Sequence, residues 1–446
     1  ETGSPGAKAA AAQEAATLEK PQPVAEQDAH RPGRLPDRVI LTWQGDPART
    51  QAVTWRTETS VTAARALIAP ADGGPKFPKQ AVDVPAVTTL LTTDLSSAHY
   101  HSVNFTGLAP ATRYAYRVGD GVNWSEWFQF RTASTTAEPF SFIYFGDAQN
   151  DLRSMWSRVI REAWSDGPKA RFMIHAGDLI NRAERDAEWG EWFEAGGWLN
   201  GMIPSVPTPG NHEYVTDKDK LLPPRLSHHW RPLFALPENG PAGFEETVYY
   251  FDYQGVRIIS LNSNVGRDRQ TAWLEQTLAD NPNRWTVITF HHPVYSAARN
   301  RDNPDLRALW KPIFDKHRVD LVLTGHDHSY VRTGLDVPEN LAEGVNQVSP
   351  EGGTVYVVSI SGPKMYEVQK QRPYVKRLAE DTQLYQIIHI DGGTLRYESR
   401  TAVGELYDAF TLNKRTGQKN ELIEQVPETP ERVRPPMEEK KAALAN

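Results

Sequence analysis

The chain of 446 residues contains no cysteine, which excludes disulfides, thiolate metal ligands and a cysteine nucleophile and leaves His, Asp and Asn as metal-binding side chains. Its formal net charge of −7 provides no basic footprint for nucleic acid. No apolar run reaches 18 residues, so we expect no membrane-spanning helix.

Residues 1–36 are rich in Ala, Glu, Gln and Pro and contain almost no large apolar side chains. Such a segment cannot bury enough apolar surface to offset the conformational entropy lost on ordering. The composition therefore predicts a disordered tail. Residues 425–446 are rich in Pro, Glu and Lys, and we expect a second disordered tail there.

Residues 37–135 contain short runs in which apolar and polar residues alternate, with turn clusters between many of them. A period of two with frequent turns predicts an all-β sandwich. The segment LAPATRY at 108–114 is similar to the tyrosine-corner segment of fibronectin type III domains. That similarity implies a hydrogen bond from the Tyr114 hydroxyl back to the backbone at a corner.

Strand-like runs alternate with helical patterns in residues 136–424, which predicts an α/β domain. After residue 352 the chain returns to strand-like runs, among them TVYVVSI, TQLYQIIHI and TLRYESR. The helical patterns cover residues 151–164, 185–195, 269–279 and 304–317.

Five short stretches present metal-capable side chains where a strand or turn ends. Apolar runs precede four of them, and a Pro-rich turn precedes the fifth. Ligands of open α/β sheets bind at the carboxyl ends of strands, so these side chains are expected to converge. Carboxylate, amide and imidazole groups together can hold two cations close to each other, which suits phosphoryl transfer. The stretches contain Asp147; Asp178; Asn211, His212 and Glu213; His291 and His292; and His326 and His328.

The order of these stretches, GD, GD, GNHE, H-x-P and GHxH, resembles the metallophosphoesterases of the calcineurin-like superfamily, and among them the purple acid phosphatases. The segment HDHSYVR at 326–332 is a further likeness, and the resemblance covers roughly residues 37 to 400. It implies a fibronectin type III-like all-β sandwich followed by an α/β catalytic domain, a four-layer metallophosphoesterase sandwich. It also implies two metal ions from among Fe, Zn and Mn, and a small phosphorylated substrate.

The resemblance assigns roles to the metal-capable residues. Asp147 and His328 would bind the first metal, and Asp178 would bridge both metals. The second metal would be completed by Asn211, His291 and His326.

Three further residues have expected roles in catalysis. By the resemblance, His212 would face the phosphate, where it stabilises charge or protonates the leaving alkoxide, because imidazole titrates near neutral pH. Glu213 would orient His212. His292 either reaches the substrate or is merely adjacent to a ligand.

The chain departs from the family pattern at the first metal. Purple acid phosphatases have a tyrosine that binds ferric iron where this chain has Asn181, and related phosphoesterases have a histidine where it has Gln149. Each of these two residues is a candidate to supply a carbonyl oxygen instead. We therefore predict that the protein is not purple and that its first site binds metal more weakly or prefers a divalent ion.

The leading functional prediction is hydrolysis of phosphate monoesters by a metal-activated hydroxide. One alternative keeps the site but uses phosphodiesters of nucleotide or phospholipid type. Another is a phosphate-binding or adhesion protein with a vestigial site. The family and a chain that begins at Glu1 rather than Met lead us to expect an extracytoplasmic location, secreted or periplasmic. The oligomeric state is left open.

The remaining notable side chains have structural interpretations. His175 lies within an apolar run and is expected to be a packed core histidine, and Arg332 is expected to be an ion-pair partner. The other histidines of this group are expected to face solvent: His99, His101, His228 and His229.

Overall fold

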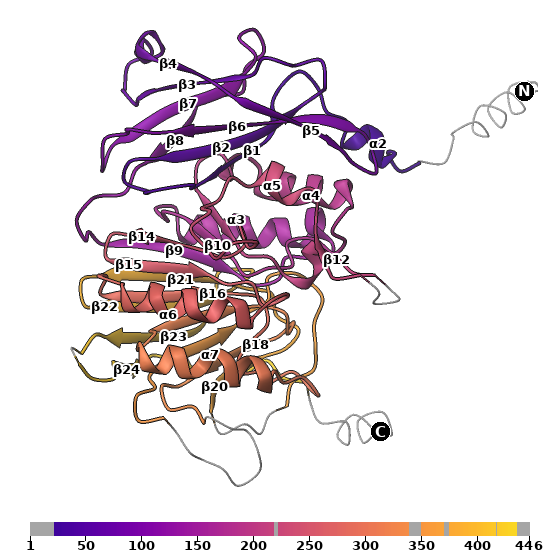
Figure 1. Ribbon diagram of the computed structural model, residues 1–446. Helices are drawn as coiled ribbons and strands as arrows, with labels where there is room; N and C mark the ends of the chain where they lie inside the picture. Colours follow the sequence, from indigo (N-terminus) through magenta and orange to yellow (C-terminus); the bar gives the residue numbers. More distant parts are fainter. Residues whose placement is uncertain (1–21, 218–221, 339–348, 370–373, 416, 435–446) are drawn as a thin grey trace, which may run out of the picture.

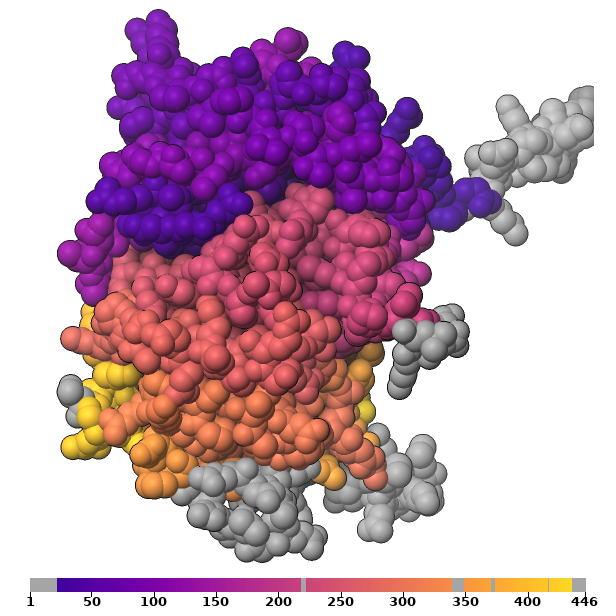
Figure 2. Space-filling view, viewed as in Figure 1, coloured from indigo at the N-terminus to yellow at the C-terminus, as the bar shows by residue number. Residues whose placement is uncertain are grey.

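The computed structural model describes residues 22–217, 222–338, 349–369, 374–415 and 417–434. They form an all-β domain that sits on a larger α/β domain, as Figure 1 shows. The two domains pack directly against each other on the face shown in Figure 2. The predicted fold class is confirmed. No helix of the described part is long and apolar enough to cross a membrane.

The β-sandwich consists of two four-stranded sheets, with strand orders β1-β2-β6-β5 and β4-β3-β7-β8. Alternate residues of the strands point into the space between the sheets, where Trp55, Phe105 and Tyr116 are buried. The Tyr114 hydroxyl accepts a hydrogen bond from the Ala109 N–H at 2.9 Å, as the tyrosine-corner segment predicted. The strands are β1 (Asp37–Thr42), β2 (Gln51–Thr57), β3 (Arg65–Pro70), β4 (Val82–Pro85), β5 (Val87–Thr92), β6 (Ser97–Phe105), β7 (Arg113–Gly119) and β8 (Phe128–Arg131).

The prediction that His101 faces solvent is wrong. Its side chain is buried, with Nε2 2.7 Å from the Thr57 hydroxyl and Nδ1 2.9 Å from the Thr88 hydroxyl. Strand β5, whose pattern did not indicate a strand, pairs with β6 in the same sheet and places Thr88 beside His101. His99 is half-buried against the carbonyl oxygen of Val61.

The α/β domain contains two seven-stranded sheets packed face to face. Their strand orders are β11-β10-β9-β21-β22-β23-β24 and β14-β15-β16-β17-β19-β18-β20. Strands β9, β10 and β11 are parallel to one another, and so are β15, β16, β17 and β19. The strands of the first sheet are β9 (Phe140–Phe145), β10 (Met173–His175), β11 (Ser205–Pro207), β21 (Leu384–Asp391), β22 (Thr394–Thr401), β23 (Leu406–Asn413) and β24 (Glu421–Glu424). Those of the second are β14 (Tyr249–Tyr253), β15 (Val256–Ser260), β16 (Trp285–Thr289), β17 (Leu321–Thr324), β18 (Tyr330–Thr333), β19 (Val355–Val358) and β20 (Val375–Ala379).

Alternation within the central strands builds the layers. In β17, Leu321 and Leu323 join the core between the two sheets, whereas Val322 points to the opposite face. Helices α6 (Thr271–Ala279) and α7 (Pro304–Lys316) cover that outer face, where Trp310 and Phe314 are buried. Helices α3 (Ser157–Asp166) and α4 (Asp186–Gly196) pack against the first sheet and complete four layers (Figure 1). A π-helical turn at Leu152–Trp156 leads into α3, and α5 (Trp230–Leu233) lies beneath the β-sandwich.

Both predicted disordered tails include ordered residues. At the N-terminal side, α2 (Glu26–Ala29) leads to a buried His30, and Glu26 pairs with Arg185. At the C-terminal side, the Glu431 carboxylate accepts a hydrogen bond from the Leu378 N–H at 2.9 Å. Disorder is therefore wrong for these stretches, because polar side chains dock on the folded domains without large apolar burial. Residues 1–21 and 435–446 lie outside the described residues.

Candidate metal centre

The predicted metal-capable residues follow the carboxyl ends of five strands in two sheets. Asp147 follows β9, Asp178 follows β10, and His326 follows β17. His291 lies two residues after β16. Asn211 follows β11, a short strand where the Pro-rich sequence indicated only a turn. Because the strands within each set are parallel, their carboxyl ends share one edge, and the five segments meet there.

Two glycines permit this close approach. A Cβ atom on Gly325 would lie 2.1 Å from the Asp147 Oδ1 atom, and one on Gly177 would lie 2.6 Å from the His291 Nδ1 atom. The next residues, Asp178 and His326, have left-handed backbones with φ of 51° and 71°. This conformation is rare for residues other than glycine, and it turns each side chain abruptly at the strand end.

Three side chains converge on His291. Its Nε2 atom lies 3.1 Å from each of three atoms: Asp178 Oδ2, Asn211 Oδ1 and His326 Nδ1. Its Nδ1 atom lies 2.9 Å from the Ala176 carbonyl oxygen, which accepts the Nδ1–H and leaves the Nε2 lone pair facing the cluster. This cluster has the oxygen and nitrogen donors that a transition-metal ion takes.

A second cluster contains Asp147 and His328. The His328 Nδ1–H donates to the Lys364 carbonyl oxygen at 3.0 Å, so in the neutral ring Nε2 is an acceptor, which the Gln149 amide nitrogen approaches at 2.9 Å. That Nε2 lies 3.0 Å from Asp147 Oδ2, a buried oxygen that receives no hydrogen bond from the described residues. Two acceptors that face each other repel unless a proton or a metal ion lies between them. The residues present therefore fit a metal ion.

The electrostatics of the site also require positive charge. Burial lowers the pKa of His291, but the carboxylates of Asp178 and Asp147 outweigh burial and raise that pKa to about 10. Burial and the charges of neighbouring histidines and of Arg301 lower the pKa of His326 far below its usual range. A metal ion would satisfy the same carboxylates.

Gln149 and Asn181, the two residues at which the chain departs from the family pattern, lie in different places. The Gln149 amide nitrogen lies 3.0 Å from Asp178 Oδ2 and 2.9 Å from His328 Nε2, inside the second cluster. Its Oε1 atom is buried and receives no hydrogen bond in the described part of the chain. No contact between described side chains joins Asn181 to either cluster. Asn181 instead lines a separate surface cavity. Only Gln149 is therefore positioned to substitute for a first-metal ligand.

His212 lies at the solvent-facing opening beside the metal-capable residues, which we call the mouth of the site. Its Nδ1–H donates to the Asn181 carbonyl oxygen at 2.5 Å, and its Nε2 lies 3.9 Å from Asp178 Oδ2. The side chain is 27% exposed, so a substrate can reach the Nε2 atom. The backbone N–H of His212 donates to Asp178 Oδ1 at 2.9 Å.

The expectation that Glu213 orients His212 is wrong. The buried Glu213 carboxylate instead accepts backbone N–H groups of Asp178 at 2.8 Å, Leu179 at 2.8 Å and Gly210 at 2.6 Å. Burial and the charge of Asp178 raise the pKa of Glu213 to about 8. Glu213 therefore ties together the two loops that carry Asp178 and Asn211.

His292 faces the mouth of the site. Its ring lies 4.1 Å, centroid to centroid, from the His326 ring. The Ser263 hydroxyl accepts the His292 backbone N–H at 2.9 Å and lies 2.8 Å from the ring Nδ1. If the hydroxyl donates to Nδ1, the ring proton resides on Nε2.

Sequence reasoning missed two residues of this mouth. The Arg301 guanidinium contacts both His326 and Asp327, and the Tyr366 ring stacks on the His328 ring at 4.5 Å between centroids. Both lie in loops, outside any strand-end stretch. The nearness of Arg301 to the H-x-P stretch was the only signal available.

The structural interpretations of other residues hold in part. His175 is a buried core histidine, and Arg332 is buried against Asp408 and Glu424. His228 is exposed, but His229 is buried beside Asp186, so the expectation of a solvent-facing side chain is wrong for His229.

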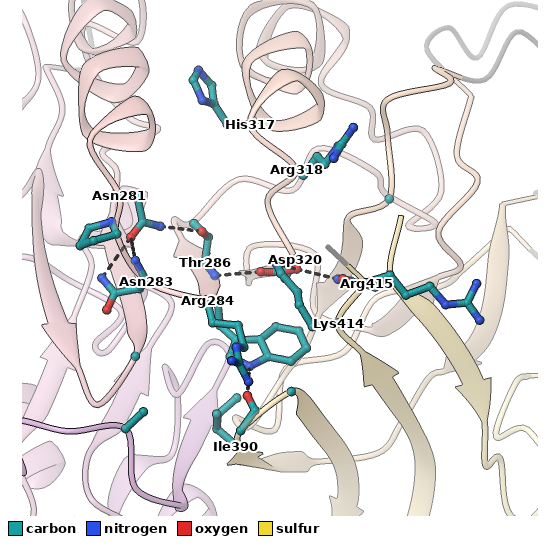
Figure 3. Close-up of a pocket in the computed structure, with 18 of the residues that line it drawn as sticks. Asn281, Asn283, Arg284, Thr286, His317, Arg318, Asp320, Ile390, Lys414 and Arg415 are labelled. Carbon is teal, nitrogen blue, oxygen red and sulfur yellow. Dashed lines mark hydrogen bonds and ion pairs between the residues drawn. The ribbon is translucent and has the colours of Figure 1, made fainter. Parts of the chain in front are cut away.

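A large cavity of about 1040 Å³ lies elsewhere, beside the amino ends of β15, β16 and β17 (Figure 3). At its centre the buried Asp320 carboxylate accepts hydrogen bonds from the Thr286 N–H at 2.9 Å and from Lys414 at 2.6 Å. Figure 3 shows the guanidinium groups of Arg318 and Arg415 pointing away from Asp320. The charges at the centre of this cavity thus neutralise each other. The site that holds the metal-capable side chains is the one at the carboxyl ends of the parallel strands.

Two family models match the chain. Residues 36–132 match the purple acid phosphatase N-terminal domain, and residues 140–330 match the calcineurin-like phosphoesterase domain. The chain belongs to the purple acid phosphatase-like metallophosphoesterases.

Similar proteins agree with this membership. An uncharacterized protein of Mycobacterium tuberculosis is 29% identical over 279 residues, which cover 54% of this chain and 51% of that protein. The chain thus matches about half the length of that relative. The Fe(3+)-Zn(2+) purple acid phosphatase 12 of Arabidopsis thaliana is 25% identical over 286 residues, covering 59% of each chain.

A solved structure has the same fold as this metallophosphoesterase. The purple acid phosphatase PPD1 from yellow lupin (Lupinus luteus) seeds superposes with a TM-score of 0.69 and 18% sequence identity. The superposition covers 86% of this chain and 75% of the lupin chain. At this identity the likeness shows the fold alone.

Proposed function

We propose that this metallophosphoesterase hydrolyses phosphate monoesters with the help of two metal ions from among Fe, Zn and Mn. The observation that carries the proposal is the pair of facing acceptors, Asp147 Oδ2 and His328 Nε2, next to the cluster around His291. Asp178 belongs to both groups of candidate ligands. When bound, two such ions polarise the phosphate oxygens and supply hydroxide from water at neutral pH.

The chain's own residues would hold and orient the reacting groups. Asp147, Gln149 and His328 would hold the first ion, Asp178 both ions, and Asn211, His291 and His326 the second. Gln149 would do so through Oε1, once its amide has turned over. Membership in the family supports this division.

His212 is the residue best placed to protonate the leaving alkoxide. The Asn181 carbonyl oxygen accepts the Nδ1–H and thereby directs Nε2 to the mouth. A protonated Nε2 would give its proton to the departing oxygen as the ester bond breaks. His292, whose Nε2 carries a proton when Ser263 donates to Nδ1, would donate a hydrogen bond to a phosphate oxygen.

One contact in the structure supports the alternative of a phosphate-binding protein with a vestigial site. The Gln149 amide nitrogen bridges Asp178 and His328, and this hydrogen-bonded bridge can replace the first ion. A chain with a single ion would be a phosphate binder with a vestigial site. Phosphodiester hydrolysis keeps the same ligands and differs only in the second substituent on the phosphorus.

The test is hydrolysis of an aryl phosphate monoester against the matching diester, by protein reloaded with Zn, Mn or Fe. Metal content per chain is measured on the same samples. Two ions and faster monoester turnover would support the proposal. A preference for the diester would assign the alternative substrate, and a lack of metal-dependent turnover would leave only the binder.

A further inference from the structure

Arg301 lies in the loop after His291 and reaches back over the metal-capable cluster. Its guanidinium donates to the Asp327 carboxylate through Nε and approaches His326 Nε2 through Nη2. The loop itself is fixed at Arg299, whose N–H donates to the Glu367 carbonyl oxygen at 2.9 Å. The arginine is therefore held on the mouth by contacts on two sides.

Part of the Arg301 guanidinium is not used by these contacts. A guanidinium has five N–H donors in a planar fork, and no hydrogen bond between described residues uses Nη1. The side chain is 32% exposed, whereas its anchor Asp327 is fully buried. The anchored side of the fork thus faces the protein, and the remaining donors can face an incoming anion.

The rim around Arg301 carries further positive charge. Arg267 and Lys364 have no ion pair with any carboxylate among the described residues. Arg267 donates through Nε to the carbonyl oxygen of Ser263 at 2.6 Å, and the hydroxyl of Ser263 contacts the His292 ring. The Lys364 ammonium and the Arg301 guanidinium both lie over the Tyr366 ring, at 5.6 and 5.1 Å from its centroid. In a chain of net charge −7, this local excess of cations attracts an anion to the mouth.

We propose that Arg301 is the residue that binds the phosphate group of the substrate and favours monoesters over diesters. The inference rests on the proposed function and adds the substrate class. A planar guanidinium pairs with two oxygens of a phosphate at once. A monoester phosphate has three oxygens without a substituent and can give two to Arg301 while one faces the metal-capable cluster. A diester has only two such oxygens and must give up one of these contacts.

Asp327 is the positioning residue for Arg301. Its carboxylate accepts from Nε and so fixes the plane of the fork, but it is buried behind the arginine and does not itself reach the substrate. Loss of Asp327 should therefore matter only while Arg301 is present. Non-additive effects of the two changes would be the signature of this arrangement.

The experiment measures binding of inorganic phosphate by calorimetry to Zn-loaded protein, and in parallel the hydrolysis of an aryl monoester and its diester. Arg301→Ala should raise the dissociation constant for phosphate by about tenfold to a hundredfold, the scale of lost charge-assisted hydrogen bonds. It should raise the KM of the monoester more than that of the diester. Arg301→Lys should recover part of the loss, because an ammonium keeps the charge but not the fork.

Arg299→Ala is the matched control, because Arg299 lies two residues away and pairs with the exposed Glu367 outside the site. It should bind phosphate as the parent does. The double variant Arg301→Ala/Asp327→Asn should bind phosphate no more weakly than Arg301→Ala. Phosphate binding in Arg301→Ala equal to that of the parent would overturn the proposal.

These outcomes separate the inference from the proposed function. A parent protein that binds phosphate through Arg301 but hydrolyses neither ester would overturn the proposed function and the monoester preference while leaving the binding role. Monoester hydrolysis that is indifferent to Arg301 would leave the proposed function and overturn the inference.

Discussion

Arg38 of the β-sandwich and Asp186 of the catalytic domain form a buried ion pair, with Nη1 2.6 Å from Oδ1 and Nη2 3.0 Å from Oδ2. Arg56, also from the β-sandwich, lies 3.4 Å from the same carboxylate. Burial raises the pKa of Asp186, but its contacts with His229 and Arg38 outweigh burial and hold that pKa below its usual range. The pair fixes one domain on the other next to α4, the helix that follows the Asp178 loop.

Removal of this carboxylate should weaken the domain interface. Asp186→Ala leaves the buried Arg38 guanidinium without its carboxylate, whereas Arg56 keeps its pair with Asp37 at 2.7 Å. We expect a loss of about 3–5 kcal/mol in the free energy of unfolding. Urea unfolding followed by tryptophan fluorescence measures the change. The control is Glu421→Ala, which breaks the exposed pair with Arg415 and should cost at most about 1 kcal/mol. Equal effects of the two variants would contradict a special role for the buried pair.

Restoring a histidine in the second cluster should strengthen metal binding there. Gln149→His replaces an amide with an imidazole between Asp178 and His328, and imidazole is a better ligand for Zn. We expect the affinity for the more weakly bound ion to rise by roughly tenfold or more, a scale on which even outer partners of a ligand act. Equilibrium dialysis against Zn measures it. An unchanged affinity would show that Gln149 does not lie at a metal position in solution.

The iron-loaded protein should lack a purple absorption band. Among the described residues, no tyrosine hydroxyl contacts Asp147, Asp178 or His328, and Asn181 stands where the family tyrosine would be. Without a phenolate ligand, ferric iron has no tyrosinate charge-transfer band. Absorption spectroscopy of protein reconstituted with ferric iron tests this. A purple band would mean that Tyr366, which stacks on His328, reaches the ion.

The stability of the β-sandwich should decrease in mild acid through His101. Burial and the charge of His99 lower the pKa of His101 to about 4 in the folded state, against about 6.5 when unfolded. A lowered pKa means that the unfolded state binds the proton more readily. Stability is therefore complete above pH 6.5 and is lost between about pH 6.5 and 4, by up to about 3 kcal/mol.

Urea unfolding at several pH values measures this dependence. His101→Gln removes the titrating group and should flatten the decline, whatever its effect on stability at pH 7. His228→Gln, at an exposed position, should keep the parent's pH dependence. A decline of the same slope in His101→Gln would show that other groups cause it.

The metal-capable set could be predicted because it follows a rule that sequence displays. Each apolar run ends at a polar residue, and parallel strands bring such ends together. Asp147 and His291 come from different sheets, yet both lie at the carboxyl ends of the parallel strands. The core histidine His175 and the ion-paired Arg332 were equally visible, because both interrupt apolar patterns.

What was missed depends on contacts between loops. Arg301 and Tyr366 are brought to the mouth by the pairing of Ala298 with Val368, which no local pattern reveals. Strand β5 went unpredicted because it lies at a sheet edge and is exposed at most of its positions. Glu213 was assigned to His212 by sequence adjacency, whereas its carboxylate accepts backbone groups 34 and 35 residues away.

The most direct test of a metal-dependent phosphomonoesterase is kcat for an aryl phosphate monoester in Zn-loaded His212→Ala, with His228→Ala as the exposed control. If His212 protonates the leaving group, kcat should fall by about 10²–10⁴-fold in His212→Ala and stay at the parent's value in His228→Ala. The loss should shrink for a monoester whose phenol is a better leaving group, since that oxygen needs less help from a proton. Turnover in His212→Ala at the parent's rate, or a parent with no metal-dependent turnover, would contradict the account.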